Sequence, residues 1–173
     1  MPLDPTLPHT DLTRRIIGCA MSVHNRLGPG YKELHYQRAL TADMLAEGLT
    51  VSEEHFVEVY DGESWVGRLY YDHLVESSVV VEVEAFAHML TSEQVAQLIT
   101  YLAAADLRVG LLFNFGRRRL EFRRILAPKD VTDWKTHARR YVWRPPSAGP
   151  LPDQERPDPQ SSPFADDSDL FRR

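Results

Sequence analysis

The sequence predicts an α/β fold in the order ααβββαββ(α), with a short basic helix as the last element. Three observations predict it. Apolar residues recur at helical spacing in three segments, and runs of β-branched and aromatic residues follow them. The chain of 173 residues, 43% of them apolar, is also long enough to bury one core.

The first two elements are helices, each with one apolar face. Asp11 or Thr13 is expected to cap the first helix. Gly28-Pro29-Gly30 ends it, because glycine accepts a left-handed cap and proline cannot continue a helix. A second helix is predicted from about Lys32 to Glu47.

Three strands follow and are predicted to form an antiparallel meander. Each is rich in β-branched or aromatic residues, and Asp61-Gly62 is a turn signal between the first two. Their expected ranges are Thr50–Tyr60, Trp65–Val75 and Val79–Ala85.

A third helix and two more strands complete the predicted domain. Thr91 or Ser92 caps the helix. The strand after it is almost wholly apolar, which indicates burial on both faces. The expected ranges are a helix to Ala105, strands at Arg108–Phe115 and Arg119–Leu126, and the basic helix at Asp130–Tyr141.

The composition divides the chain into three regions. Residues 1–10 hold three prolines and are expected to form a loose arm, and residues 11–143 form the folded domain. Residues 144–173 hold seven of the twelve prolines together with clustered Ser and Asp. Such a segment buries too little apolar surface to offset the entropy of ordering it, so a disordered tail is predicted.

Charge and cysteine content restrict the function. The net charge of −5 gives no global sign of a nucleic-acid binder, but residues 117–140 carry nine Lys or Arg against three Asp or Glu. The single cysteine, Cys19, excludes an internal disulfide and an all-cysteine metal site. No apolar run is long enough to span a bilayer, so we expect a cytoplasmic protein without a membrane partner.

Three carboxylates fall on two neighbouring predicted strands. Glu82 and Glu84 share one strand face, roughly 6–7 Å apart, and Asp72 on the preceding strand is brought beside them by a short turn. Like charges on an apolar strand are costly, and Mg²⁺ prefers carboxylate oxygens. The acids are therefore a candidate metal site for phosphodiester hydrolysis. The alternative is that they are ordinary carboxylates on a solvated sheet face.

The segment Gly30-Tyr31-Lys32-Glu33-Leu34-His35-Tyr36 resembles the signature of the GxxExxY protein family, a group within the PD-(D/E)xK nuclease superfamily. The resemblance runs from about Ile16 to about Ile125 and includes residues 27–30 and 110–116. It implies a restriction-endonuclease-like core, with a mixed sheet flanked by helices and a divalent-metal site at one edge.

The resemblance also implies site residues. Asp72 and Glu82 match the first and second acids of the superfamily, and Glu33 resembles the helix glutamate that supports the metal. Gln97 and Tyr101 resemble the QxxxY element of the RecB-like branch and lie one helical turn apart. Both are expected to contact the substrate or the acids.

Glu84 departs from the family pattern, which has lysine two residues after the second acid. That lysine would hold the attacking water and stabilise charge on the phosphate. A carboxylate can instead act as a further metal ligand or a general base, but it supplies no positive charge. Lys32 is the only lysine near the predicted site, and Arg68 shares the strand face of Asp72.

Two functions remain open. One is a Mg²⁺- or Mn²⁺-dependent nuclease that acts on DNA or RNA, with DNA the more expected of the two. The other is an inactive member of the fold that binds nucleic acid or a protein partner, for which the acidic, aromatic tail is a candidate docking peptide. The expected phosphate contacts are Arg117, Arg118, Arg119, Arg123 and Lys32, although a solvated edge strand would also account for the arginines.

Overall fold

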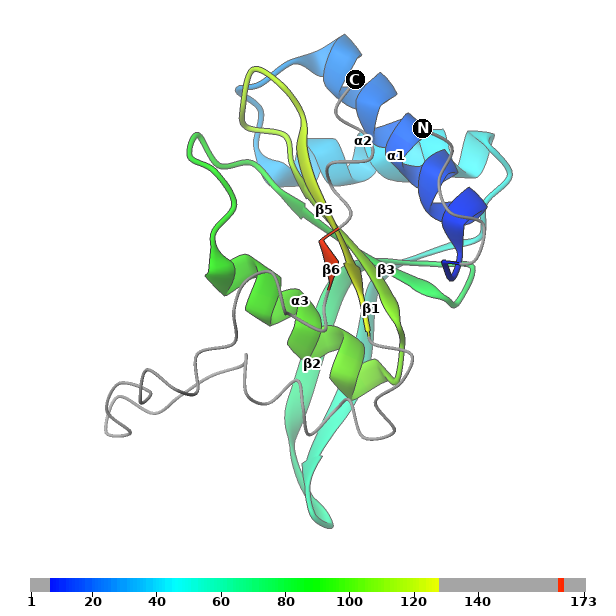
Figure 1. Cartoon of the computed structure of the whole chain (residues 1–173), viewed down its shortest axis with the longest axis vertical. Helices are drawn as coiled ribbons and strands as arrows, with labels where there is room; N and C mark the ends of the chain where they lie inside the picture. The colour runs from blue at the N-terminus through cyan, green and yellow to red at the C-terminus, as the bar shows by residue number, and fades with distance from the viewer. Residues whose placement is uncertain (1–6, 128–164, 167–173) are drawn as a thin grey trace.

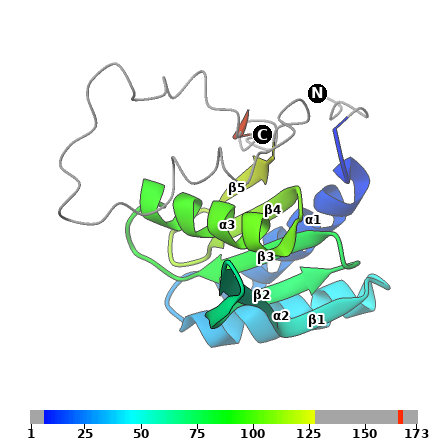
Figure 2. The same ribbon diagram turned by 90° about the horizontal axis from the view of Figure 1, so that it is seen from below.

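The chain folds as a β-sheet with helices on both faces (Figures 1 and 2). This is a computed structural model, and it describes residues 7–127 and 165–166. Helices α1 (Thr10–Leu27) and α2 (Glu33–Ala46) cover one face, and α3 (Ser92–Ala105) covers the other. The predicted α/β class is confirmed, and so is the order of its elements from the first helix to the fifth strand.

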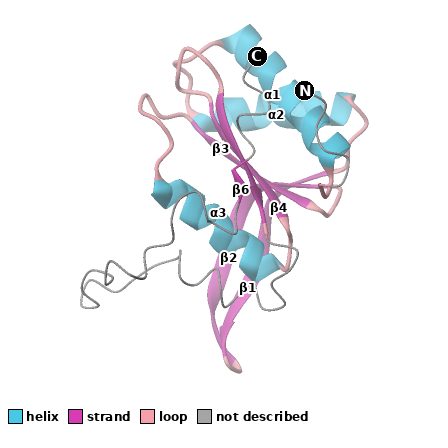
Figure 3. Cartoon of the chain, viewed as in Figure 1, coloured by secondary structure: helices cyan, strands magenta, loops and turns pink. Residues whose placement is uncertain are grey.

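The sheet is mixed, and its strands are drawn in magenta in Figure 3. Strands β1 (Val51–Asp61), β2 (Ser64–Val75) and β3 (Val79–Glu84) form the predicted antiparallel meander. Strand β4 (Val109–Asn114) runs parallel to β3 because α3 crosses between them, and β5 (Glu121–Leu126) returns antiparallel to β4. The acidic strand β3 therefore lies inside the sheet, between β2 and β4.

Apolar residues of β3 and β4 fill cores on both sides of the sheet. Val81 and Phe113 pack toward α1 and α2, whereas Val80 and Leu112 pack toward α3. All six residues of β4 are buried, as its apolar sequence predicted. The same alternation leaves Glu82 and Glu84 less buried than the valines around them.

The start of α1 differs from the prediction. The helix begins at Thr10, and His9 stands at its N-cap in a left-handed conformation (φ 56°) without a side-chain hydrogen bond. Thr13 does not cap the helix, because it is already inside it and its hydroxyl donates to the Thr10 carbonyl. The helix ends as predicted at Gly28, whose φ of 64° favours glycine.

The β1–β2 hairpin extends beyond the rest of the sheet (Figure 1). Opposite Asp72, Glu54 has a φ of 47°, which interrupts the regular ladder. Beyond this point Arg68 pairs with Glu58 at 3.2 Å and lies over the ring of Phe56. Arg68 was expected to lie on the strand face of Asp72, but its partners Glu58 and Phe56 both belong to the hairpin.

Some predictions concern segments outside the described residues, namely the helix at Asp130–Tyr141 and most of the tail. Within the tail, Ala165–Asp166 form β6, which pairs antiparallel with Ile125 and Leu126 of β5. No helix within the described ranges is long and apolar enough to cross a membrane.

Candidate functional site

Two of the predicted acids meet where β2 separates from β3. In the antiparallel pairing of β2 with β3, His73 lies opposite Val81. At the next position Asp72 bonds β3 through its side chain, whose Oδ2 accepts a hydrogen bond from the Val83 N–H at 2.7 Å. The Asp72 N–H in turn donates to Glu82 Oε1 at 3.4 Å. Asp72 and Glu82 therefore lie side by side at the point where β2 and β3 separate.

Helix α2 brings Glu33 to the same place through Gln37. The Gln37 side-chain amide donates to Asp72 Oδ1 at 2.8 Å and to Glu33 Oε1 at 3.1 Å. One NH₂ group carries two hydrogens, so it can serve both acids. Sequence reasoning missed Gln37. The available signal was its position one helical turn after Glu33, on the same helix face.

The acids make one another harder to ionise. Burial, followed by the charge of Asp72, raises the pKa of Glu82 to about 9. Burial, followed by the charges of Glu33 and Asp72, raises the pKa of Glu84 to about 7. Burial also raises the pKa of Asp72 and of Glu33. These shifts show four carboxylates sharing one poorly solvated region.

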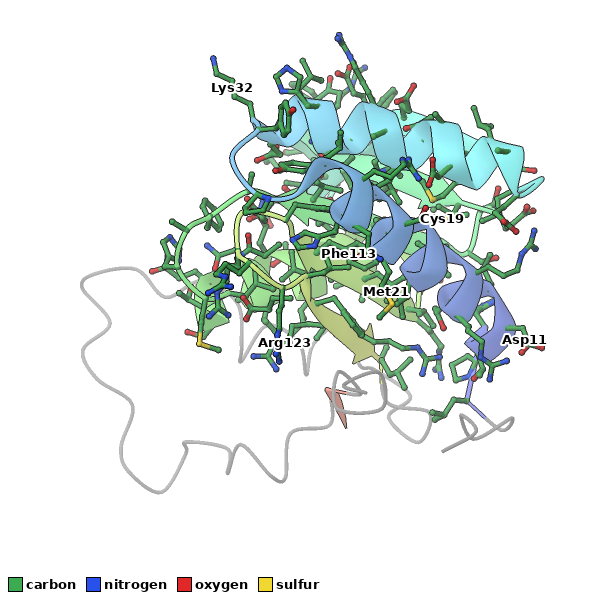
Figure 4. All side chains as sticks on the ribbon, turned by 90° about the horizontal axis from the view of Figure 1, so that it is seen from above. Asp11, Cys19, Met21, Lys32, Phe113 and Arg123 are labelled. Atoms are coloured by element: carbon green, nitrogen blue, oxygen red, sulfur yellow. The ribbon has the colours of Figure 1, made fainter. Side chains whose placement is uncertain are left out.

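No cation within residues 7–127 forms an ion pair with any of these four acids. Lys32 stands at the N-cap of α2, and Figure 4 shows its side chain pointing away from the body of the protein. His88 only partly offsets the raised pKa of Glu84. The neighbours of the cluster thus leave its negative charge without a full counterion.

The chemistry of the donors fits a hard divalent cation, because Mg²⁺ and Mn²⁺ prefer carboxylate oxygens. The positions of these carboxylates fit a metal ion less well than their chemistry does. In the part of the chain that the structure describes, no group of three or more His, Cys, Asp or Glu side chains could hold a metal ion. The expected convergence of Asp72, Glu82 and Glu84 on one ion is therefore not seen in this arrangement, in which both Asp72 oxygens accept hydrogen bonds.

Gln97 and Tyr101 form a hydrogen-bonded pair on α3. Gln97 Nε2 donates to Tyr101 Oη at 2.6 Å, and the Tyr101 ring lies 6.0 Å from that of Tyr71. Burial raises the pKa of Tyr101, and the charges of Glu82 and Asp72 act in the same direction. The QxxxY pair therefore lies within electrostatic reach of the acids, on the side of the sheet opposite α2.

Two buried histidines, His24 and His73, make structural contacts. His24 is buried, and its Nε2 lies 2.8 Å from the Arg117 carbonyl oxygen. His73 is fully buried, with Nε2 2.9 Å from Thr41 Oγ1 of α2. Burial lowers the pKa of His73 to about 4, so it is neutral near pH 7. His73 follows Asp72 in β2, and both side chains contact α2.

Tyr36 fixes the loop that precedes α2. Its hydroxyl donates to the Gly28 carbonyl at 2.7 Å and accepts from the Tyr31 N–H at 3.1 Å. Its ring stacks on Phe115, with centroids 4.8 Å apart. Phe115 donates its backbone N–H to the carbonyl of Glu84. The tyrosine of the signature therefore ties the α1–α2 loop to the end of β3.

Replacing Tyr36 with phenylalanine is expected to destabilise the protein by about 1–3 kcal/mol, because a buried hydroxyl that satisfies two backbone groups is lost while the ring stays. Urea unfolding measures the change. Tyr60→Phe is the matched control, since its hydroxyl bonds only the exposed Glu58 and should matter by less than about 0.5 kcal/mol. Equal effects of the two changes would contradict the role given to Tyr36.

The predicted phosphate contacts divide into two groups. Arg117 and Arg123 lie 3.4 and 3.8 Å from carboxylate oxygens of Glu121. Arg118 and Arg119 are exposed on the β4–β5 loop, and no ion pair among the described residues involves them. Arg118, Arg119 and Lys32 are therefore the better candidates for contacts with an external anion.

Comparison with known proteins adds one finding. Residues 10–125 match the family model described as the PD-(D/E)XK nuclease superfamily, which covers α1 through nearly all of β5. No curated protein and no solved structure gives a significant match.

Proposed function

The chain belongs to the PD-(D/E)XK nuclease superfamily, and from this we propose that it is a divalent-metal-dependent nuclease that hydrolyses phosphodiester bonds, in DNA rather than RNA. The observation that supports this most is the cluster of Asp72, Glu82, Glu84 and Glu33, with which no cation among residues 7–127 forms an ion pair. A buried acidic cluster of this kind is costly unless a ligand compensates its charge.

Asp72, Glu82 and Glu84 would hold Mg²⁺ or Mn²⁺. When bound, the ion would lower the pKa of a water molecule and stabilise charge on the phosphoryl oxygens. Glu33 and Gln37 orient Asp72 through their shared hydrogen bonds. A carboxylate shift that frees Asp72 from one N–H group would open it to the ion.

Glu84 takes the position of the usual lysine with a different role. Without a metal ion, burial and the charges of Glu33 and Asp72 raise the pKa of Glu84 to about 7, whereas a bound cation would lower that pKa and keep Glu84 ionised as a ligand. Gln97 and Tyr101 orient the substrate from α3 through their polar groups. In this proposal the charge that lysine would supply comes from the metal ion alone.

The loop geometry also supports membership of the GxxExxY group within the superfamily. Gly30 has a φ of 115°, Glu33 shares Gln37 with Asp72, and Tyr36 bonds Gly28. Each signature residue thus has a separate physical task here.

A second candidate is a catalytically inactive member of the fold that binds nucleic acid or a protein partner. Glu84 favours it, because the position that carries positive charge in the family carries a carboxylate here. The absence of a ready three-ligand group among the described residues points the same way.

Cleavage assays separate the two candidates. Labelled single- and double-stranded DNA and RNA are incubated with the protein in Mg²⁺, Mn²⁺ or EDTA, beside Asp72→Asn and Glu82→Gln variants. The nuclease proposal expects metal-dependent cutting that both variants lose and that the exposed-site control Glu63→Gln retains. No cutting by the wild type with either ion would favour the inactive module, and cutting that persists in both variants would show that these acids are not the catalytic site.

A further inference from the structure

Three loops surround the end of β3 that carries Glu84. The α1–α2 loop is tied to it through Tyr36 and Phe115, which bonds the Glu84 carbonyl. The β3–α3 loop follows Glu84 directly in the chain. The β4–β5 loop completes the set, because it approaches the β3–α3 loop at Gly116 and is joined to the α1–α2 loop through Tyr36.

Gly116 shows how closely the β4–β5 loop approaches. A Cβ atom added there would lie 2.6 Å from the Ala85 carbonyl oxygen and closer still to that of Phe86. On its other side, the Arg117 carbonyl lies 2.8 Å from His24 Nε2 near the end of α1. The three loops therefore form one continuous rim, defined here as residues 28–32, 85–91 and 115–120.

The charge of this rim is opposite to that of the acids behind it. Its three segments contain four cations and no Asp or Glu, in a chain whose net charge is −5. The cations are Lys32, Arg117, Arg118 and Arg119. Arg117 pairs with Glu121, whereas the other three are exposed. A positive rim around an acidic centre suits a phosphate backbone that passes over a metal site.

The rim also presents flat and apolar side chains to solvent. Tyr31 and Met89 are each 51% exposed, although both are residues that usually contribute to cores. The Tyr31 ring lies 5.8 Å from that of His35, and the rings of Phe86 and His88 stack 4.7 Å apart. Tyr31 belongs to the α1–α2 loop and His35 to the first turn of α2, whereas Phe86 and His88 both belong to the β3–α3 loop.

We propose that this rim binds an unpaired nucleic-acid strand, with bases stacked on the Tyr31 and Phe86–His88 rings and phosphates held by Arg118, Arg119 and Lys32. Aromatic faces can stack on a base only when the base has left its own stack, which excludes an intact duplex. A single strand also bends toward partly buried acids, whereas a duplex is stiff over about 150 base pairs. The inference deepens the proposed nuclease function and rests on it only for the identity of the substrate site.

Fluorescence anisotropy in EDTA measures binding without cleavage. The full chain is titrated into a labelled oligothymidine and into a duplex of equal length at low salt. The expected result is single-strand binding at least tenfold tighter than duplex binding. Tyr31→Ala should weaken single-strand binding about tenfold, the range for loss of one stacking contact.

Matched controls separate the rim from general effects. Trp65→Ala removes an equally exposed aromatic residue from the distant hairpin, and Arg14→Ala removes an exposed cation from α1; both should bind like the wild type. The double variant Arg118→Ala/Arg119→Ala should lower the salt dependence of binding by a slope of about 1.4. Thermal melting confirms that each variant folds.

Equal or tighter binding of duplex would overturn the inference, as would a Tyr31→Ala protein that binds like Trp65→Ala. The outcome is independent of catalysis. Single-strand binding without cleavage in any metal would support the rim and remove the nuclease proposal. Metal-dependent cleavage without a preference for single strands would support the nuclease proposal and remove the role given to the rim.

Discussion

Replacing Glu82 with glutamine is expected to abolish cleavage while making the metal-free protein more stable at pH 8. The carboxylate is a proposed metal ligand, so activity should fall at least about 100-fold. The same carboxyl group lies in a buried acidic cluster, where the folded protein must keep it protonated at a pH at which the unfolded chain ionises it, and this opposes folding. One substitution should therefore change activity and stability in opposite directions.

The pH dependence fixes the sign of the stability effect. The pKa of Glu82 is about 9 in the folded protein against an ordinary value of 4.5. Between these values the folded state keeps a proton that the unfolded state has lost, so the free energy of unfolding falls as pH rises through this window. Glutamine does not titrate and removes that dependence.

Urea unfolding in EDTA at pH 5 and pH 8 measures this effect. The stabilisation by Glu82→Gln should be small at pH 5 and on the order of 2 kcal/mol at pH 8. Glu63→Gln on the exposed hairpin turn is the control and should show no such difference. A Glu82→Gln protein that is less stable than the wild type at pH 8 would contradict the raised pKa.

Replacing Gly116 with alanine is expected to be the most damaging single-atom change in the rim. The new Cβ would meet the backbone of Ala85 and Phe86, and neither atom belongs to a flexible side chain that could move aside. The β3–α3 loop would have to shift away from β4. We expect a loss of about 3 kcal/mol or more in the free energy of unfolding.

Gly18 supplies the matched control for this change. It lies inside α1, and an added Cβ would have nothing within 4 Å. Gly18→Ala should therefore stabilise the protein by up to about 1 kcal/mol through helix propensity. Thermal unfolding of both variants tests the contrast. Similar stabilities would show that the loops are not packed as closely as the structure has them.

The acidic strand was predictable because its signals are local. Alternation along a strand places Glu82 and Glu84 on one face, and a meander with short turns places β2 beside β3. The parallel neighbour β4 could be recognised from its apolar run. The family resemblance assigned the mixed sheet, and the structure agrees with it.

Other features depend on tertiary contacts that no periodicity encodes. Gln37 bonds Asp72 only because α2 lies beside β2 at that residue. Arg68 lies outside the site because it pairs with Glu58 in the hairpin, beyond the interruption at Glu54. The left-handed cap at His9 similarly has no sequence signal, since histidine is not a favoured N-cap residue.

Measuring divalent-cation binding is the decisive test of the proposal that Asp72, Glu82 and Glu84 hold a metal ion. Isothermal titration of Mn²⁺ into the metal-free protein at pH 8 reports it without any nucleic acid. The wild type is expected to bind Mn²⁺ saturably. Asp72→Asn and Glu82→Gln should each abolish this binding, and Glu63→Gln should retain it. Binding that survives in both site variants, or no binding by the wild type, would contradict the proposal.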